Sequence, residues 1–227
     1  VILGSCRQAG NRVNPARTAA VRGGVTMDAP AITLNMACPS GMRAIGFASQ
    51  AIRLGESQVV MVGGFDSMST IPYLLKNTRW SGFKMGDKNL EDGWSDSVDP
   101  VAGMGMGGTA EKLWDKYKIP REEQDQFAAE SHEKAFKAWE NGYFDAEVVP
   151  ITVPPAHKRA EEVIFAKDET IRWPVSAEKM GKLPAVFRKG GTVTAASTSN
   201  LGIWYFGGAD PNDFDFDLSA ATLGALQ

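Results

Sequence analysis

Cys38 is the residue of this chain whose type and setting are best suited to covalent chemistry. Before it, Ile32, Leu34 and Met36 alternate with polar residues, and Pro39 follows it directly. The alternation has the period of two that is typical of a strand, and proline is favoured at the first positions of a helix. The sequence therefore predicts a strand-to-helix turn that presents a thiol at the N-terminal end of a helix.

Two interpretations of Cys38 are open on this local pattern. At the positive end of a helix a thiolate is stabilised and the pKa of the thiol falls, which suits a nucleophile. Free cysteine is also among the most buried residue types, so a structural cysteine fits the pattern as well. We expect the other cysteine, Cys6, to be buried and inert.

Strand and helix patterns alternate around this turn. Short strands are predicted at 1–3, 31–36 and 59–62, and helices at 14–23 and 40–54. The helix that follows Cys38 carries Met42, Ile45, Ala48 and Ile52 on one face. The run at 59–62 is wholly apolar, as in a buried parallel strand. This order of elements predicts an α/β fold with a layered sheet.

The character of the sequence changes after residue 69. Helices are predicted at 109–117 and 122–141, and a strand that returns to the sheet at 192–195. Every lysine lies between Lys76 and Lys189, which sets the middle of the chain apart as a separate unit. We therefore predict three segments: 1–69, 70–188 and 189–227.

Composition excludes several classes of function. The formal net charge of −3 gives no case for binding nucleic acid or an anionic membrane surface. Two cysteines make no disulfide framework, and no apolar run approaches the ~20 residues of a membrane span. The chain opens on a buried-strand pattern and not on a signal peptide, so its start looks internal. A cytoplasmic location is expected, with an organelle such as a mitochondrion or peroxisome as the alternative.

Neither histidine has the spacing of a metal site, so no metal is expected. We expect His132 to be an exposed or half-buried helix residue and His157 to lie in a loop.

Five groups of residues, in this order and at plausible spacing, resemble the thiolase family. They are VILG (1–4) with QAG (8–10) and NPAR (14–17), then CPSGMRA (38–44), GGFDSMS (63–69), MGGTAE (106–111) and GTVTA (191–195). The resemblance runs from residue 1 to about residue 201. Each group alone is weak, whereas the five together are specific.

The resemblance implies a thiolase-like layered αβαβα core, present as an incomplete N-terminal half at 1–69. It also implies an inserted α-rich loop domain over the coenzyme A site at 70–188, and a return strand followed by a divergent acidic tail at 189–227. The implied reaction is acyl transfer between coenzyme A thioesters through a Cys38 thioester, either acetoacetyl-CoA formation or thiolysis of a 3-ketoacyl-CoA. The backbone N–H of Cys38 would help to hold the oxyanion. Coenzyme A thioesters are the substrates, and no further cofactor is implied.

The same resemblance implies a set of residues that bind acyl-CoA: Met106, Arg172, Phe187, Ala195, Ser199 and Leu201. Each also has a plain interpretation, as core, as loop or as a solvated surface residue. Residues 79–92 resemble the loop through which many thiolases build tetramers from dimers. A homodimer or homotetramer is therefore expected.

The sequence also departs from the family. The Gly-His-Pro, Cys-x-Gly and Asn-Glu-Ala-Phe motifs that complete the thiolase site do not occur in it. Divergence begins near Gly202, Pro39 replaces a small residue, and Gly105 stands where many biosynthetic members carry histidine. Since a positioned base contributes ~10²–10⁴-fold, the hypothesis is a thiolase fragment that is acylated slowly without completing a condensation cycle.

Two other classes compete with this interpretation. Thioester synthases, such as hydroxymethylglutaryl-CoA synthase or ketoacyl-carrier-protein synthase, share the core and the cysteine, but the long insert with MGGTAE argues for thiolase. The alternative without catalysis is a module that binds acyl-CoA, lipid or a protein partner.

Overall fold

The computed structural model describes residues 1–11, 13–80, 82–93, 98–155 and 161–197 of the 227-residue chain. The described residues up to Gly93 belong to one compact unit, and those from Val98 onward belong to a second. The first unit contains the predicted cysteine turn, and the second contains the two predicted longer helices.

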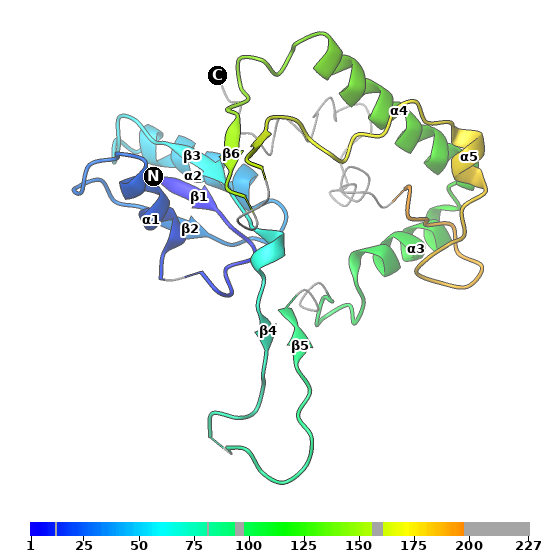
Figure 1. The fold of residues 1–227 in the computed structure, drawn as a ribbon, viewed down its shortest axis with the longest axis horizontal. Helices are drawn as coiled ribbons and strands as arrows, with labels where there is room; N and C mark the ends of the chain where they lie inside the picture. The colour runs from blue at the N-terminus through cyan, green and yellow to red at the C-terminus, as the bar shows by residue number, and fades with distance from the viewer. Residues whose placement is uncertain (12, 81, 94–97, 156–160, 198–227) are drawn as a thin grey trace. The chain divides into compact units, whose positions relative to one another are not determined.

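The first unit is built on a three-stranded parallel sheet. Its strands are β1 (Ile2–Gly4), β2 (Ile32–Leu34) and β3 (Val62–Gly64), and their order is β2-β1-β3 (Figure 1). Ile2 of the central strand stands opposite Ile32 on one side and Val62 on the other. The parallel pairing confirms the predicted α/β class, although β3 begins only at the end of the valine-rich run.

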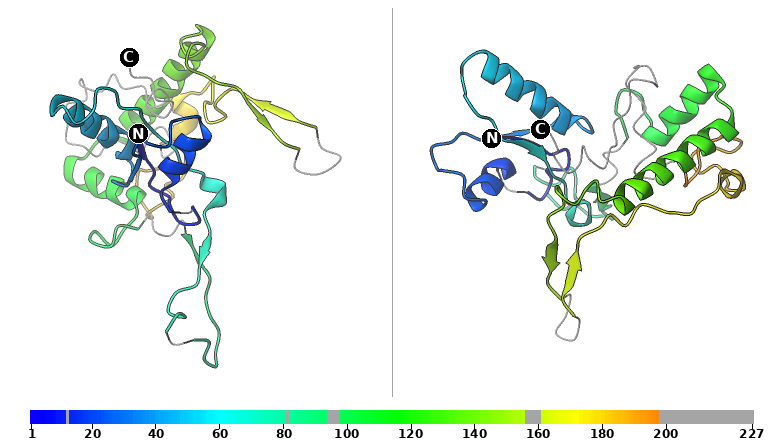
Figure 2. Two further views of the ribbon diagram at one scale, coloured as in Figure 1. Left: turned by 90° about the vertical axis from the view of Figure 1, so that its left-hand side faces the viewer. Right: turned by 90° about the horizontal axis from the view of Figure 1, so that it is seen from above.

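Helices α1 (Pro15–Arg22) and α2 (Ser40–Arg53) lie on opposite faces of this sheet (Figure 2). The first is capped by Asn14, whose Oδ1 accepts a hydrogen bond of 3.1 Å from the N–H of Arg17. The capping side chain satisfies one of the donors that a helix N-terminus leaves unpaired.

Helix α2 packs on the sheet through small residues. Ala44 and Ala48 are buried against Ile2, with Leu34 and Val62 at the edge of the same cluster. Of the four apolar residues predicted to share one face, only Ala48 is buried in this core. The other three, Met42, Ile45 and Ile52, are exposed.

Glycine allows β1 to approach the first turn of α2. A Cβ atom at Gly4 would lie 2.6 Å from the backbone nitrogen of Gly41 and 2.6 Å from the carbonyl carbon of Ser40. Backbone atoms cannot retreat as a flexible side chain can, so this approach excludes any larger residue. The contact fixes the start of α2, and with it the turn that carries Cys38.

A short hairpin ends the described part of the first unit. After the 3₁₀ turn η1 (Met68–Thr70), β4 (Tyr73–Leu74) pairs antiparallel with β5 (Glu91–Asp92). The connecting loop contains most of the segment at 79–92 that was predicted to join subunits. Among its described residues, five large apolar side chains are exposed: Leu75, Trp80, Phe83, Met85 and Leu90. Its role in assembly stays a prediction.

The second unit is dominated by α3 (Met106–Tyr117) and α4 (Arg121–Glu140). Both confirm predicted helices, although α3 begins three residues earlier than expected. Gly142, in the left-handed conformation at φ 71°, follows the end of α4 as the sequence indicated. The short helix α5 (Ala177–Gly181) packs against α4, and β6 (Ile151–Val153) pairs with β7 (Val163–Phe165) in an exposed hairpin.

Residues 192–195 do not form the predicted strand. Ala185 and Thr194 make an isolated bridge, and the N–H of Val186 donates to the carbonyl oxygen of Val193 over 3.0 Å. The chain between them turns at Gly190, whose φ of +73° suits glycine. We call residues 185–194 the 185–194 hairpin. The predicted division of the chain at residues 69 and 188 stays a prediction.

Across the described ranges, no helix is both long and apolar enough to cross a membrane.

Candidate active site

Cys38 lies in the turn between β2 and α2, with its side chain exposed. Ala37 before it has a φ of 55°, in the left-handed region, and Pro39 after it is the N-cap of α2. A residue other than glycine in the left-handed region costs about 1–3 kcal/mol. The surrounding structure must therefore hold the turn in place.

Two side chains hold this turn by hydrogen bonds to its backbone. Ser40 Oγ accepts from the N–H of Met36 over 2.9 Å and donates to the carbonyl oxygen of Ala37. Asn35 Oδ1 accepts from the N–H of Ala37 over 2.9 Å. Since Ser40 is only 4% exposed, its hydroxyl is shielded from water and both of its bonds are effective. The result is a fixed thiol at the start of a helix.

The electrostatic environment of Cys38 corrects one prediction. Partial burial of the sulfur raises the pKa of the thiol above its ordinary value. The backbone N–H of Cys38 and the charge of Arg7 act in the opposite direction but do not outweigh burial. The prediction that the helix end lowers this pKa was therefore wrong for the described structure. Desolvation disfavours the thiolate by more than the backbone N–H and the charge of Arg7 stabilise it.

The second cysteine is bound to a carboxylate. Cys6 Sγ donates to Asp66 Oδ2 over 3.0 Å. Burial first, and then this bond and the charge of Asp66, raise the pKa of the Cys6 thiol to about 11. Cys6 is half-buried where full burial was expected, and its raised pKa agrees with the prediction of an inert thiol.

Asp66 also binds the residues that follow β1. Its carboxylate accepts from the hydroxyl of Ser5 over 3.1 Å and from the N–H of Arg7 over 2.8 Å. Burial alone would raise the pKa of Asp66, but the hydrogen bonds from Cys6, Arg7 and Ser5 outweigh it and lower the pKa. The carboxylate therefore stays ionised and keeps the loop after β1 in place.

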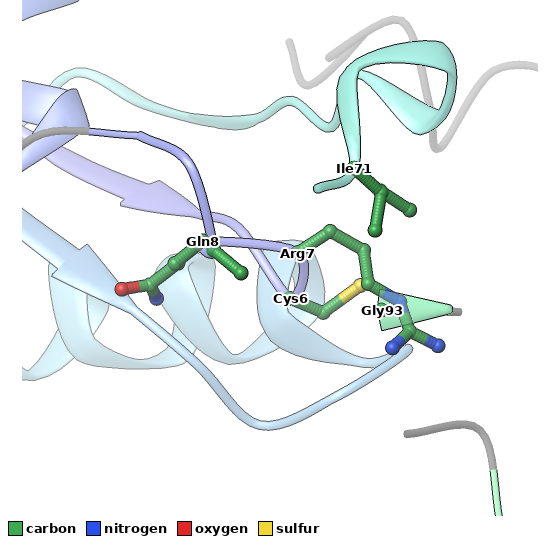
Figure 3. Close-up of a pocket in the computed structure, with 6 residues that line it drawn as sticks. Cys6, Arg7, Gln8, Ile71 and Gly93 are labelled. Atoms are coloured by element: carbon green, nitrogen blue, oxygen red, sulfur yellow. The ribbon is translucent and has the colours of Figure 1, made fainter. Parts of the chain in front are cut away.

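A small pocket lies beside Cys6 and is shown in Figure 3. It is lined by Cys6, Arg7, Gln8, Ala9, Ile71 and Gly93. In the close-up, the sulfur of Cys6 and the side chain of Arg7 lie near Gly93, opposite Ile71. Because Cys6 is protonated and Cys38 is not among the lining residues, this pocket does not support nucleophilic chemistry.

In the second unit, the structure brings together part of the predicted acyl-CoA set. A Cβ atom at Gly107 would lie 2.4 Å from ring atoms of Phe187, so the ring rests on the first turn of α3. Met106 is the neighbour of that glycine at the start of the helix. Phe187 remains 50% exposed. Ala195, also exposed, directly follows the 185–194 hairpin that carries Phe187.

Arg172 is exposed and lies in a segment held by α4. Its backbone N–H donates to His132 Nδ1 over 3.2 Å. His132 is only 4% exposed, so the expectation of an exposed or half-buried histidine was wrong. Burial first, and then the charge of Arg172, lower the pKa of His132. Ser199, Leu201 and His157 lie outside the described residues.

Sequence reasoning missed the polar side chains that support these positions. They are Ser40, Asp66, Glu111 and His132, whose partners are backbone N–H groups or side chains of other segments. Three of them stood inside groups that carry the family resemblance: Ser40 in CPSGMRA, Asp66 in GGFDSMS and Glu111 in MGGTAE. Polar residues within otherwise small and apolar motifs were the available signal.

The fold and the turn define a parallel α/β protein with a cysteine presented at a strand-to-helix junction. The chain belongs to the thiolase family, because the family profile "Thiolase, N-terminal domain" matches residues 1–202. This finding confirms the resemblance seen in the sequence.

Relatives and solved structures agree with this assignment. A "Probable acetyl-CoA acyltransferase" of Staphylococcus aureus is 43% identical over 203 residues, which cover 88% of this chain and 51% of the relative. The crystal structure of the Bacillus anthracis acetyl-CoA acetyltransferase is similar with a TM-score of 0.79 and 45% identity, over 86% of this chain and 49% of that one. Human mitochondrial 3-ketoacyl-CoA thiolase is similar with a TM-score of 0.77 and 37% identity, over 85% and 48%. The chain thus spans about half the length of these proteins.

Proposed function

We propose that this chain carries the acyl-accepting part of a thiolase-type acyltransferase, with Cys38 as the nucleophile. The observation that supports this most is the exposed thiol at the β2–α2 turn, in a chain that the thiolase N-terminal profile matches from residue 1 to residue 202. The names of the relatives support acetyl-CoA and 3-ketoacyl-CoA as the substrate class.

In the proposed first step, the Cys38 thiolate attacks the carbonyl carbon of the acetyl-CoA thioester. A carbon–sulfur bond forms to Cys38, the bond to coenzyme A breaks, and the leaving thiolate takes up a proton. In the condensing direction, a second acetyl-CoA that has lost a proton from its methyl carbon attacks the acyl-enzyme. This releases acetoacetyl-CoA and the Cys38 thiolate. Thiolysis of a 3-ketoacyl-CoA is the same sequence in reverse.

The raised pKa of Cys38 limits what this chain does by itself. At neutral pH its thiolate is a minor species, and a positioned base would contribute ~10²–10⁴-fold to its reaction. The Gly-His-Pro motif that supplies such a base in the family does not occur in these 227 residues. We therefore propose slow acylation without a completed condensation cycle.

The proposed acyl-CoA contacts are Met106, Arg172, Phe187, Ala195, Ser199 and Leu201. In the second unit, the half-exposed ring of Phe187 beside the start of α3 offers an apolar surface for a pantetheine or acyl chain. Coenzyme A thioesters are the substrates, and the chemistry needs no metal or other cofactor. Assembly to a homodimer or homotetramer through the loop at 79–92 is part of the same proposal.

The test is to incubate the chain with acetyl-CoA and measure intact-protein and peptide mass. An acetyl adduct confined to the Cys38 peptide, reversed by free coenzyme A and absent from Cys38→Ala, is the expected result. Cys6 is the internal control, since its pKa of about 11 leaves it protonated at neutral pH. Equal modification of both cysteines would contradict the proposal. Binding of acetyl-CoA without any adduct would favour a module that binds acyl-CoA without catalysis.

A further inference from the structure

Glu111 is a charged side chain in the interior of the second unit. It lies in α3 and is 2% exposed, among the largest fully buried side chains of the described structure. A buried carboxylate is costly unless hydrogen bonds or an ion pair compensate for the lost water. Nothing in the proposed chemistry uses it, so its partners indicate its role.

Those partners all lie in the 185–194 hairpin. Oε1 accepts from the N–H groups of Thr192 and Val193 over 3.0 and 2.9 Å. Oε2 accepts from the N–H of Thr192 over 3.1 Å and from Arg188 Nη2 over 3.4 Å. Three donors from one short segment therefore converge on a single carboxylate.

Close approach at Gly191 makes this convergence possible. A Cβ atom at that position would lie 2.2 Å from Glu111 Oε1 and 2.6 Å from Cδ. The hairpin has further attachments on its outer side, because Arg188 also binds Asp115 with distances of 2.6 and 3.0 Å. Gln124 Nε2 donates to Thr192 Oγ1 over 3.2 Å.

The hairpin carries Phe187, and Ala195 follows it directly. Phe187 lies next to Arg188, and its ring rests on Gly107, one turn before Glu111 in α3. The carboxylate and the ring thus attach the same hairpin to the same helix, with half of the ring left exposed.

We infer that Glu111 is a positioning residue that holds Phe187 in the orientation in which it contacts acyl-CoA. This inference rests on the proposed function. A carboxylate is suited to the task because both oxygens accept hydrogen bonds. In Glu111→Gln one of them becomes an NH₂ group that faces N–H donors, while volume and shape are almost unchanged. The attachment is weakened without creating a cavity.

The test measures acetyl-CoA binding to the full chain in a Cys38→Ala background, so that no adduct forms. We expect Glu111→Gln to raise the Kd for acetyl-CoA about tenfold, the scale of one lost charged hydrogen bond. Asp115→Asn is the matched control. It removes the charge and one acceptor oxygen from the outer partner of Arg188 and leaves Glu111 with its bonds to Thr192 and Val193, so a change under about threefold is expected.

A double-mutant cycle with Phe187→Ala separates positioning from general destabilisation. If Glu111 acts through the ring, Glu111→Gln has little further effect on Kd once the ring is gone. Equal effects in both backgrounds would overturn the inference. Faster hydrogen exchange at the amides of Thr192 and Val193, with unchanged exchange in α4, is expected in the chain without ligand.

The outcomes for the two proposals differ. If the Cys38→Ala chain does not bind acetyl-CoA, the proposed function fails, and the inference that rests on it fails too. If that chain binds and Glu111→Gln binds equally well, only the inference is overturned. Should Glu111→Gln not fold, Gly191→Ala tests the same contact from the hairpin side, because its methyl group must displace the carboxylate. Unchanged affinity there would overturn the inference.

Discussion

Cys6 Sγ lies 3.0 Å from Asp66 Oδ2 and donates its proton to that oxygen. Burial and this bond together keep Cys6 in its thiol form. The same carboxylate accepts the backbone N–H of Arg7 and the hydroxyl of Ser5. The two cysteines of the first unit are thus chemically different. One is a protonated partner of a carboxylate, and the other is exposed at a helix start.

We predict that iodoacetamide at pH 8 labels Cys38 before Cys6. With a pKa of about 11, Cys6 is a thiolate in only about one molecule in a thousand at that pH, and the thiolate is the reactive form. Peptide mass analysis over time gives both rates. Burial is the largest cause of the raised Cys6 pKa, and the hydrogen bond to Asp66 and its charge add to it. Asp66→Asn removes that charge, so labelling of Cys6 should accelerate while that of Cys38 stays within about twofold. Equal rates in the parent chain would contradict this assignment.

The Cys6 thiol also predicts a loss of stability in alkali. Its pKa is raised in the folded chain from 9.0 to about 11, so the folded state holds the proton more tightly than the unfolded state does. The contribution is complete below pH 9.0 and is lost as the pH rises toward 11. Urea unfolding between pH 8 and 11 measures it. Cys6→Ser should reduce the fall in the free energy of unfolding over this pH range. An unchanged fall would show that other groups cause the loss.

Ser40→Ala is predicted to loosen the turn that carries Cys38. The substitution leaves the N–H of Met36 without its side-chain acceptor, and should lower the free energy of unfolding by about 1–3 kcal/mol. Acetylation of Cys38 by acetyl-CoA should slow by more than the unfolded fraction explains, because the left-handed Ala37 loses one of the two side chains that hold it. Ser49→Ala, on the exposed side of α2, is the control. A Ser40→Ala chain as stable as the parent would contradict the argument.

Two glycines near α2 are predicted to respond in opposite directions to alanine. Gly4→Ala places a methyl group 2.6 Å from backbone atoms of α2 and should destabilise the chain by about 1–3 kcal/mol. At Gly46, within α2, the nearest atom to an added Cβ is Arg43 Nη1 at 3.6 Å. Gly46→Ala should therefore stabilise the chain by about 0.5–1 kcal/mol through helix propensity. The midpoints of denaturant unfolding measure both effects. A Gly4→Ala chain as stable as the parent would refute the close approach.

His132 predicts a loss of stability in mild acid. Burial lowers its pKa below 6.5 in the folded chain, so the folded state resists a proton that the unfolded state accepts. The contribution is complete above pH 6.5 and is lost as the pH falls through the folded pKa. Urea unfolding measured from pH 5 to 8 should show the free energy of unfolding fall as the pH is lowered. His132→Gln, which keeps an acceptor for the N–H of Arg172, should reduce this fall.

Much of the first unit follows from local pattern. The alternation before Cys38, the proline after it and the apolar run before Gly63 predicted two strands and the start of a helix. The structure has all three, although β3 shares only Val62 with the predicted strand. These features depend on neighbours in the chain, so they are readable from the sequence. The face of α2 that packs was not predicted, because Ala44 is buried by its fit to the sheet and not by its hydrophobicity.

The sequence by itself determined the family, the α/β class and Cys38 as the candidate nucleophile, since each rests on residue types at fixed spacing. Only the tertiary structure decided the pKa directions of the cysteines, the burial of His132 and the place of Glu111 against the 185–194 hairpin. Glu111 and Val193 are 82 residues apart in the chain, and Cys6 and Asp66 are 60 apart. Desolvation and hydrogen bonding depend on which atoms meet after folding, and no spacing along the chain specifies such pairs.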